Sequence, residues 1–478
     1  MSVCHHLTSA ASVGLFQNVV MQSGNCGDPA VWRPRESALD VGRAFSKRLG
    51  CADAESAGDC LRDADLVDIV NAQYYPGGRG DGGVYAREVK RNRAGSTSPR
   101  RRLLGAAVGG GTRRAWQERQ EGPNPPLAPV LPWGPVVDGR SDGVEAPPLQ
   151  LARRGRHARG VSVILGTNRD EGSLFAPLAP LIDWDWHVPL DDEDVRKLLA
   201  HVLSGGGGET AIGEGGDGDG GGIDDLVDAV MARYPSPAGN RAAVDALALP
   251  LAAFKRVFSR WGATLGGRGD ARDARGPRLD DGSRGDGSST AARTGYDTQL
   301  GRLSAIISDQ MFTCPARRMA AALSATNRVK DHEMAIRAPS RAERGGSVAP
   351  VWLYQFTYDV RWSGPLRTCH GSDVPYVFRR FRGLPPFSRD ARMAAAFLRY
   401  WRDLAHSGDP NDPGEVIDGR SVGECGADCV AWPRWATGST STRGGVSLDL
   451  NLPAATVEGL SDDLCDFWDE VERNRTII

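Results

Sequence analysis

The sequence has no long hydrophobic run and no excess of charge of either sign. No stretch reaches the roughly 18 consecutive apolar residues that a membrane-spanning helix requires, so no transmembrane segment is expected. The 58 Lys and Arg residues nearly balance the 60 Asp and Glu residues, and the net charge is −2. With this balance no overall field draws the protein to nucleic acid or to a membrane, and neither is an expected partner.

Hydrophobic residues are also scarce, at 40% of the chain, while Gly fills 60 positions. These values indicate polar, Gly-rich segments mixed with foldable ones. Three stretches, 77–126, 204–222 and 263–295, are rich in Gly and charged residues and hold few large apolar side chains. Such segments cannot bury enough surface to offset an ordering entropy of roughly 1–2 kcal/mol per residue. We expect them to be disordered surface insertions in a single domain spanning 1–478, or translated sequence that does not belong to the protein.

Metal and nucleic-acid signals are weak. Cys425 and Cys429 have a spacing that metal sites use, but no further Cys or His lies close to them in sequence. We therefore expect no metal and no cofactor. The segment from Arg87 to Arg119 holds ten basic residues, yet it has little aromatic interleaving, so a solvated loop is the better interpretation.

Between these segments the pattern indicates strands alternating with helices. Short apolar runs at Gln17–Met21, Val161–Leu165 and Val351–Tyr358 are typical of buried parallel strands. An apolar stripe from Met393 to Leu404 at helical spacing predicts a helix that ends at Gly408. The alternation predicts an α/β layer fold.

Seven segments in a fixed order carry a resemblance to a known family. They are SVCHHLTSAASVGLFQNVVMQSGN (2–25), LGCADAESAGDCLR (49–62), WGPVVDG (133–139) with GTNRDEGSLF (166–175), SDQMFTCPARRMA (308–320), CHGSDVPYVF (369–378), WRDLAHSGDPN (401–411) and CDFW (465–468). Together they resemble type-B carboxylesterases, the cholinesterase-like α/β-hydrolases. The resemblance implies an incomplete α/β-hydrolase fold, with late sheet strands, their covering helices and no amino-terminal part.

The resemblance implies catalytic roles for Glu171 and His370. An ester-cleaving triad needs a base that takes the nucleophile's proton and a carboxylate that orients the imidazole. Glu171 follows the strand Val161–Leu165, and His370 follows the strand Val351–Tyr358. If these strands are parallel, both residues lie at one edge of the sheet. The family order is Ser, acid, His, which these two positions fit.

The nucleophile of such a triad is expected directly before Ser2, outside this sequence, on a G-x-S-x-G elbow. The oxyanion loop of the family is also expected upstream. Ser56, in Ala54-Glu55-Ser56-Ala57-Gly58, imitates an elbow, but it lies between two cysteines in a polar loop and not between a strand and a helix. We therefore do not expect Ser56 to be a nucleophile.

The resemblance also implies two disulfides, Cys51 with Cys60 and Cys314 with Cys465. They suggest a secretory location, although Met1–His6 has neither the basic start nor the apolar stretch of a signal peptide, and the location stays open.

Four further residues fall at family pocket positions: Trp32, Leu174, Phe175 and Phe312. Core packing explains the aromatic residues as well as a substrate pocket does. Leu174 replaces an aromatic that holds choline in cholinesterases. Because cation–π attraction needs a ring face, Leu174 disfavours a choline ester.

The leading hypothesis is a carboxylic-ester hydrolase whose complete form acts on a small-molecule ester. This chain alone, without the nucleophile, is expected to be inactive. The alternative is a neuroligin-like binding or adhesion homologue that keeps the fold without activity. Such a homologue has no need of Glu171 and His370, so their joint presence favours the hydrolase.

Overall fold

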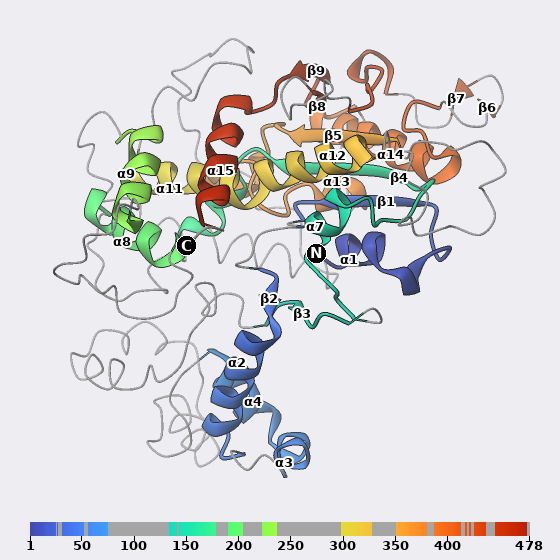
Figure 1. Cartoon of the computed structure of the whole chain (residues 1–478). Helices are drawn as coiled ribbons and strands as arrows, with labels where there is room; N and C mark the ends of the chain where they lie inside the picture. Colours follow the sequence, from blue (N-terminus) through green and yellow to red (C-terminus); the bar gives the residue numbers. More distant parts are fainter. Residues whose placement is uncertain are drawn as a thin grey trace, which may run out of the picture. The chain divides into compact units, whose positions relative to one another are not determined.

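A computed structural model describes residues 1–24, 26, 31–51, 56–74, 133–140, 143–177, 190–203, 222–236, 298–326, 350–379, 387–412, 416–417, 420–421, 425–435 and 445–475 (Figure 1). These residues form two compact units. The first comprises Met1–Pro29, Gly139–Leu198 and Asp224–Ile478, and the second comprises Ala30–Asp138 and Leu199–Ile223. Of the three expected insertions, 77–126, 263–295 and all of 204–222 except Gly222 lie outside the described residues.

A five-stranded sheet forms the centre of the first unit. Its strands, in spatial order, are β1 (Asn18–Gln22), β4 (Ser162–Asn168), β5 (Val351–Phe356), β8 (Val446–Leu450) and β9 (Ala455–Glu458). The first four run parallel, and β9 is antiparallel to β8. The three apolar runs of the sequence thus correspond to β1, β4 and β5, and the α/β prediction is confirmed. Every residue of β4 is buried, as expected for a strand covered on both faces.

Helix α14 (Arg389–Ser407) covers one face of this sheet. Its apolar stripe packs with alternate residues of β5 and β8 in one large core. Ser388 caps its first turn through a hydrogen bond to the Ala391 N–H, and Gly408 ends it in the left-handed conformation, with φ 82°. The predicted end at Gly408 is therefore correct.

Further helices contact the sheet (Figure 1). Helix α12 contacts β4, β5 and α7, and α1 contacts β1 and α7. The remaining elements of this unit are α1 (Ser2–Thr8), η1 (Ala10–Ser12), α7 (Pro148–Arg153), η2 (Glu171–Ser173), α8 (Asp192–Leu203), α9 (Ile223–Arg233), α11 (Gln299–Ser308), η4 (Asp309–Thr313), α12 (Cys314–Thr326), η5 (Arg361–Leu366), α13 (Val374–Val377), β6 (Val416–Ile417), β7 (Arg420–Ser421), η6 (Gly426–Asp428) and α15 (Asp462–Arg475). Two helices cross the boundary between the units: the last five residues of α8 and the first residue of α9 belong to the second unit.

Helix α15 is fixed to α12 by covalent and ionic bonds. Cys314 and Cys465 form a disulfide, with their Cα atoms 5.0 Å apart. The buried Arg317 pairs with Asp462, and Arg318 pairs with Asp469 at 2.5 Å. The family-implied pair is therefore present, and it holds the last described helix against the body of the unit.

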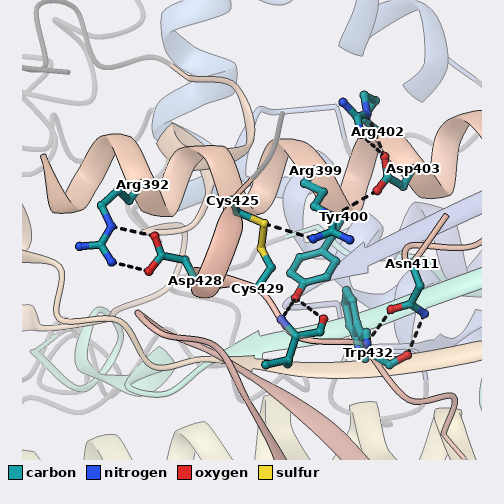
Figure 2. The surroundings of a disulfide bond; sticks show 11 residues. Arg392, Arg399, Tyr400, Arg402, Asp403, Asn411, Cys425, Asp428, Cys429 and Trp432 are labelled. Carbon is teal, nitrogen blue, oxygen red and sulfur yellow. Dashed lines mark hydrogen bonds and ion pairs between the residues drawn. A yellow bond between two sulfur atoms is a disulfide. The ribbon is translucent and has the colours of Figure 1, made fainter. Parts of the chain in front are cut away.

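A second disulfide in this unit, Cys425–Cys429, was not expected. It closes a short turn around η6 that lies against α14 (Figure 2). Polar contacts hold the same turn: Arg392 forms two hydrogen bonds with the carboxylate of Asp428, one of 2.7 Å, and the Tyr400 hydroxyl donates to the Val430 carbonyl at 2.8 Å. The metal interpretation of this cysteine spacing is therefore replaced by a disulfide.

The other cysteines complete this pattern. Cys4 pairs with Cys26 in the first unit, and Cys51 pairs with Cys60 in the second. Cys369 is the free one, buried within the loop that follows β5 and holds His370. Burial, followed by the nearby charge of Glu171, raises the pKa of its thiol to about 12, so Cys369 is a neutral thiol at physiological pH.

The second unit is mainly helical in its described part. It contains β2 (Arg33–Pro34), α2 (Arg35–Arg48), α3 (Ala57–Asp63), α4 (Leu66–Tyr74) and β3 (Val136–Val137). Strands β2 and β3 pair in parallel, and the Arg48 guanidinium donates to the Ala72 carbonyl, which ties α2 to α4. Ser56 precedes α3 inside the Cys51–Cys60 loop. The described residues before this loop belong to α2 and the turn that ends it, whereas a nucleophile elbow follows a buried strand.

The described residues contain neither a membrane-spanning helix nor a cluster of metal ligands. None of the described helices is long and apolar enough to cross a membrane. Across the same ranges, no group of three or more His, Cys, Asp or Glu side chains could hold a metal ion.

Candidate active site

Glu171 is fixed at the carboxyl end of β4. The strand ends at Asn168, and Glu171 begins the short helix η2 with no exposed surface. Its Oε1 accepts a 2.7 Å hydrogen bond from the Asn168 backbone N–H and another from the Ser23 hydroxyl. A buried carboxylate is costly unless it is paired and hydrogen-bonded, so these donors make a charged Glu171 tolerable here.

Ser23 reaches Glu171 from the end of the neighbouring strand β1. It has a φ of 51°, which is uncommon for a residue with a side chain. Its N–H donates to the Gly166 carbonyl at 2.8 Å, while its hydroxyl donates to Glu171. Two hydrogen bonds thus hold a strained backbone position, an arrangement that is frequent at functional sites.

His370 lies in the loop after β5 and contacts Glu171 directly. Its Nδ1 is 2.6 Å from the Glu171 Oε2. Because an ionised carboxylate only accepts hydrogen bonds, Nδ1 carries the donated proton and Nε2 is free to act as a base. The His370 side chain is 34% exposed, whereas Glu171 is inaccessible. Solvent or a ligand can therefore reach the imidazole but not its carboxylate partner.

The charge balance of the site favours a protonated imidazole. Burial acts to lower the pKa of His370, but the hydrogen bond and the charge of Glu171, with the charge of Asp373, raise it above its ordinary value. Burial, followed by the charge of Glu171, raises the pKa of the Asp373 carboxyl as well. The Glu171 carboxylate therefore stabilises the imidazolium form of His370.

Two aromatic rings flank the imidazole. The ring centroids of Phe175 and Phe312 lie 5.1 Å and 5.2 Å from that of His370, and the two phenyl rings stack at 5.7 Å with an angle of 17°. Leu174 packs instead with Leu366 and Cys369. The structure therefore brings Phe175 and Phe312 to His370, whereas Leu174 belongs to a small apolar cluster beside it.

An irregular helix places Phe312. The segment η4 is a π-helix between α11 and α12, a form that is rare and frequent at functional sites. At the start of this segment, Asp309 accepts a hydrogen bond from Tyr234, and the preceding Ser308 accepts one from the Gly172 N–H at 2.9 Å. Both the ring of Phe312 and the turn of Glu171 are thereby fixed to the same helical junction.

Trp32, the fourth expected pocket residue, belongs to the second unit, where it is buried. A second elbow-like string also exists, Gly-Arg-Ser-Asp-Gly at 139–143. The strand that precedes it, β3, has two residues, and several irregular residues follow Gly143 before α7 begins at Pro148. This context differs from the strand–elbow–helix unit of α/β-hydrolases, and Ser141 itself lies outside the described residues.

Sequence reasoning missed three polar residues of the site: Ser23, Asn168 and Asp373. A signal for the first two was present, since each closes or follows an apolar strand as Glu171 does, and parallel strand ends share one edge. The arrangement as a whole is a partly exposed base, oriented by a buried carboxylate and flanked by aromatic rings. It can accept a proton from a hydroxyl group and return it to a leaving group.

Comparison with known proteins identifies a family. The model of the carboxylesterase family matches residues 1–92 and 286–468. The human protein named cocaine esterase is 30% identical over 76 residues, which cover 14% of this chain and 14% of that protein. A solved structure named PNB esterase is 16% identical with a TM-score of 0.50; the match covers 98% of this chain and 61% of that one. The chain thus spans less than two thirds of the length of either relative, and it belongs to the carboxylesterase family.

Proposed function

We propose that the chain contributes the base and the acid of a serine esterase. The observation that carries this proposal is the 2.6 Å contact between His370 Nδ1 and Glu171 Oε2, with the imidazole partly exposed. Membership of the carboxylesterase family and the names of the two relatives, both esterases, support it at the level of the reaction class. The substrate class is a small-molecule carboxylic ester.

The chemistry follows from the geometry of the pair. His370 Nε2 takes the proton of a serine hydroxyl as that oxygen attacks the ester carbonyl, and later gives it to the leaving alkoxide. Glu171 keeps Nδ1 protonated and stabilises the imidazolium between these steps. The serine of this proposal lies on a G-x-S-x-G elbow directly before Ser2 in a longer polypeptide. Phe175 and Phe312 offer the apolar surface for the organic groups of the ester.

The test starts from the transcript upstream of the codon for Met1. If it encodes the elbow in frame, the longer polypeptide should hydrolyse p-nitrophenyl butyrate, and His370→Ala or Glu171→Gln should abolish turnover. Residues 1–478 alone should be no faster than controls, because triad members act as a unit. Turnover by residues 1–478 that Ser56→Ala or Ser141→Ala removes would overturn the assignment of the nucleophile. A folded longer polypeptide without activity would favour a binding homologue.

A further inference from the structure

Both members of the proposed catalytic pair rest on Asn168, a residue with no role in the chemistry described above. Asn168 is the last residue of β4 and is fully buried. Its backbone N–H donates to Glu171 Oε1 at 2.7 Å, and its side-chain Nδ2 donates to the carbonyl of Cys369 at 2.8 Å. The same residue therefore holds the acid and the peptide unit that directly precedes the base.

Further hydrogen bonds hold the loop at Asp373, on the other side of His370. Asn168 Nδ2 is also 3.3 Å from Asp373 Oδ1, and the Gln22 side chain donates to Asp373 Oδ2 at 2.6 Å. Both oxygens of this buried carboxylate thus accept from amides that belong to β4 and β1. The loop from Cys369 to Asp373, which contains His370, is therefore bound to the ends of two neighbouring strands.

These side-chain hydrogen bonds matter because the loop itself contains little regular secondary structure. Gly371 has a φ of 78° and follows His370 directly. Within the loop the Ser372 hydroxyl donates to the Cys369 carbonyl at 2.5 Å, and the Ser372 N–H donates to the same carbonyl at 3.0 Å. These bonds shape the turn but do not connect it to β4. Before the loop, Thr368 exchanges hydrogen bonds with Asp170, the neighbour of Glu171, at 3.0 and 3.3 Å. The Asn168 amide adds contacts to Cys369 and Asp373, the residues on either side of His370 in the loop.

We propose that Asn168 is a positioning residue, whose amide keeps the His370 loop in register with Glu171 while its backbone N–H holds the carboxylate. The inference rests on the proposed roles of His370 and Glu171 and adds the element that aligns them. Without the amide, the loop can shift, and the imidazole loses its aligned contact with the carboxylate.

The chain offers a matched control in Asn18. Its Nδ2 donates to the Leu404 carbonyl at 2.9 Å, which ties β1 to α14. This bond has the same chemistry as the Asn168–Cys369 bond, an Asn side chain on a neighbouring strand of the same sheet donating to a backbone carbonyl. It does not involve Glu171 or the His370 loop. Loss of either amide should lower the melting temperature, but only one should alter the imidazole.

The experiment is an NMR titration of the His370 ring in the wild-type chain, Asn168→Ala and Asn18→Ala, with the His370 signal identified by its loss in His370→Gln. We expect Asn168→Ala to lower the pKa of His370 by about one unit, as loss of a close opposite charge does, and to weaken the Nδ1–H signal. Asn18→Ala should leave both unchanged. Equal His370 titration in Asn168→Ala and wild type, or equal shifts in both variants, would overturn the proposal.

Asn168→Ser provides a second measurement if Asn168→Ala does not fold. A hydroxyl keeps one donor but is too short to span both acceptors, so an intermediate shift of the His370 pKa is expected. An unshifted His370 in a folded Asn168→Ser variant argues against positioning. Failure of both Asn168 variants to fold, with Asn18→Ala folded, would show that the amide serves folding instead. None of these readouts requires ester turnover, so failure of the proposed activity leaves this test intact.

Discussion

His370 and Glu171 are 199 positions apart in the chain, yet the imidazole Nδ1 lies 2.6 Å from the Glu171 carboxylate. The contact follows from the pairing of the two strands that precede them. Strands β4 and β5 are parallel neighbours, with Asn168 opposite Phe356 at their carboxyl ends. Since parallel strands end at a shared edge, the turns that follow them meet there. The segments between these strands in sequence do not need to take part.

The ionic contact predicts how stability varies with pH. The pKa of His370 is raised in the folded protein, so the pair should stabilise the fold fully below the ordinary pKa of histidine and lose this contribution as pH rises through the folded-state value. Glu171→Gln keeps the shape but removes the charge and should lower the pKa of His370. Urea unfolding at several pH values checks this. A pH dependence of stability that is the same in Glu171→Gln and wild type would contradict the ion pair.

The turn that contains Glu171 also includes a glycine, Gly172, at which we expect no larger residue to be tolerated. A Cβ on Gly172 would lie 2.1 Å from the backbone oxygen of Ser304 in α11. Backbone cannot move aside as a flexible side chain can, so Gly172→Ala should destabilise the protein by about 2–3 kcal/mol or more. It should also displace Glu171, which a change in the His370 titration would report.

Gly301 is the matched control for this substitution. It lies in α11, the helix whose backbone Gly172 approaches, and the nearest atom to its Cβ position, the Thr298 Oγ1, is 3.4 Å away. Since Ala is the better helix former, Gly301→Ala should stabilise the protein by about 0.5–1 kcal/mol. Thermal unfolding of both variants checks the pair of predictions, and equal destabilisation would show that the close approach of Gly172 to Ser304 does not determine the cost.

Much of this arrangement could be predicted from the sequence because it depends on local pattern. The runs around Val161–Leu165 and Val351–Tyr358 identified two central strands, and polar residues after them identified an edge. What the sequence does not reveal depends on three-dimensional packing. The π-helix that carries Phe312 and the approach of the Ser23 hydroxyl to Glu171 arise from contacts between distant segments. The pairing of Cys425 with Cys429 depends on how their turn packs against α14.

The two unequal loops closed by disulfides predict unequal contributions to stability. Cys425 and Cys429 are separated by 4 positions, and Cys314 and Cys465 by 151. The chain-entropy relation gives about 2 kcal/mol for the short loop and about 5 kcal/mol for the long one. Polar contacts of Asp428 and Val430 with α14 hold the short turn even without its disulfide (Figure 2).

We therefore expect the Cys314→Ala/Cys465→Ala double variant to lose far more stability than Cys425→Ala/Cys429→Ala. Urea unfolding midpoints measured without reductant, with peptide mapping to verify the remaining disulfides, check this. Similar losses in the two double variants would mean that the turn around η6 depends on its covalent link and that its contacts with α14 contribute little.

Ser23 affects stability through its backbone conformation and through its hydroxyl group, and the substitutions Ser23→Ala and Ser23→Gly separate these two effects. Its φ of 51° is costly for a residue with a Cβ, and its hydroxyl donates to the buried Glu171. Ser23→Ala keeps the strained backbone and leaves the carboxylate with one donor fewer, which should cost about 1–3 kcal/mol. Ser23→Gly loses the same hydrogen bond but relieves the backbone, so it should recover about 1 kcal/mol of that loss. Both variants should change the His370 titration equally, because the ring responds to Glu171 and not to the conformation of residue 23. Thermal unfolding and NMR titration of the two variants test this separation. If Ser23→Gly proved less stable than Ser23→Ala, the left-handed conformation would not be a source of strain. If the His370 titrations of the two variants differed, the backbone conformation of Ser23 would itself determine the geometry of the Glu171 carboxylate.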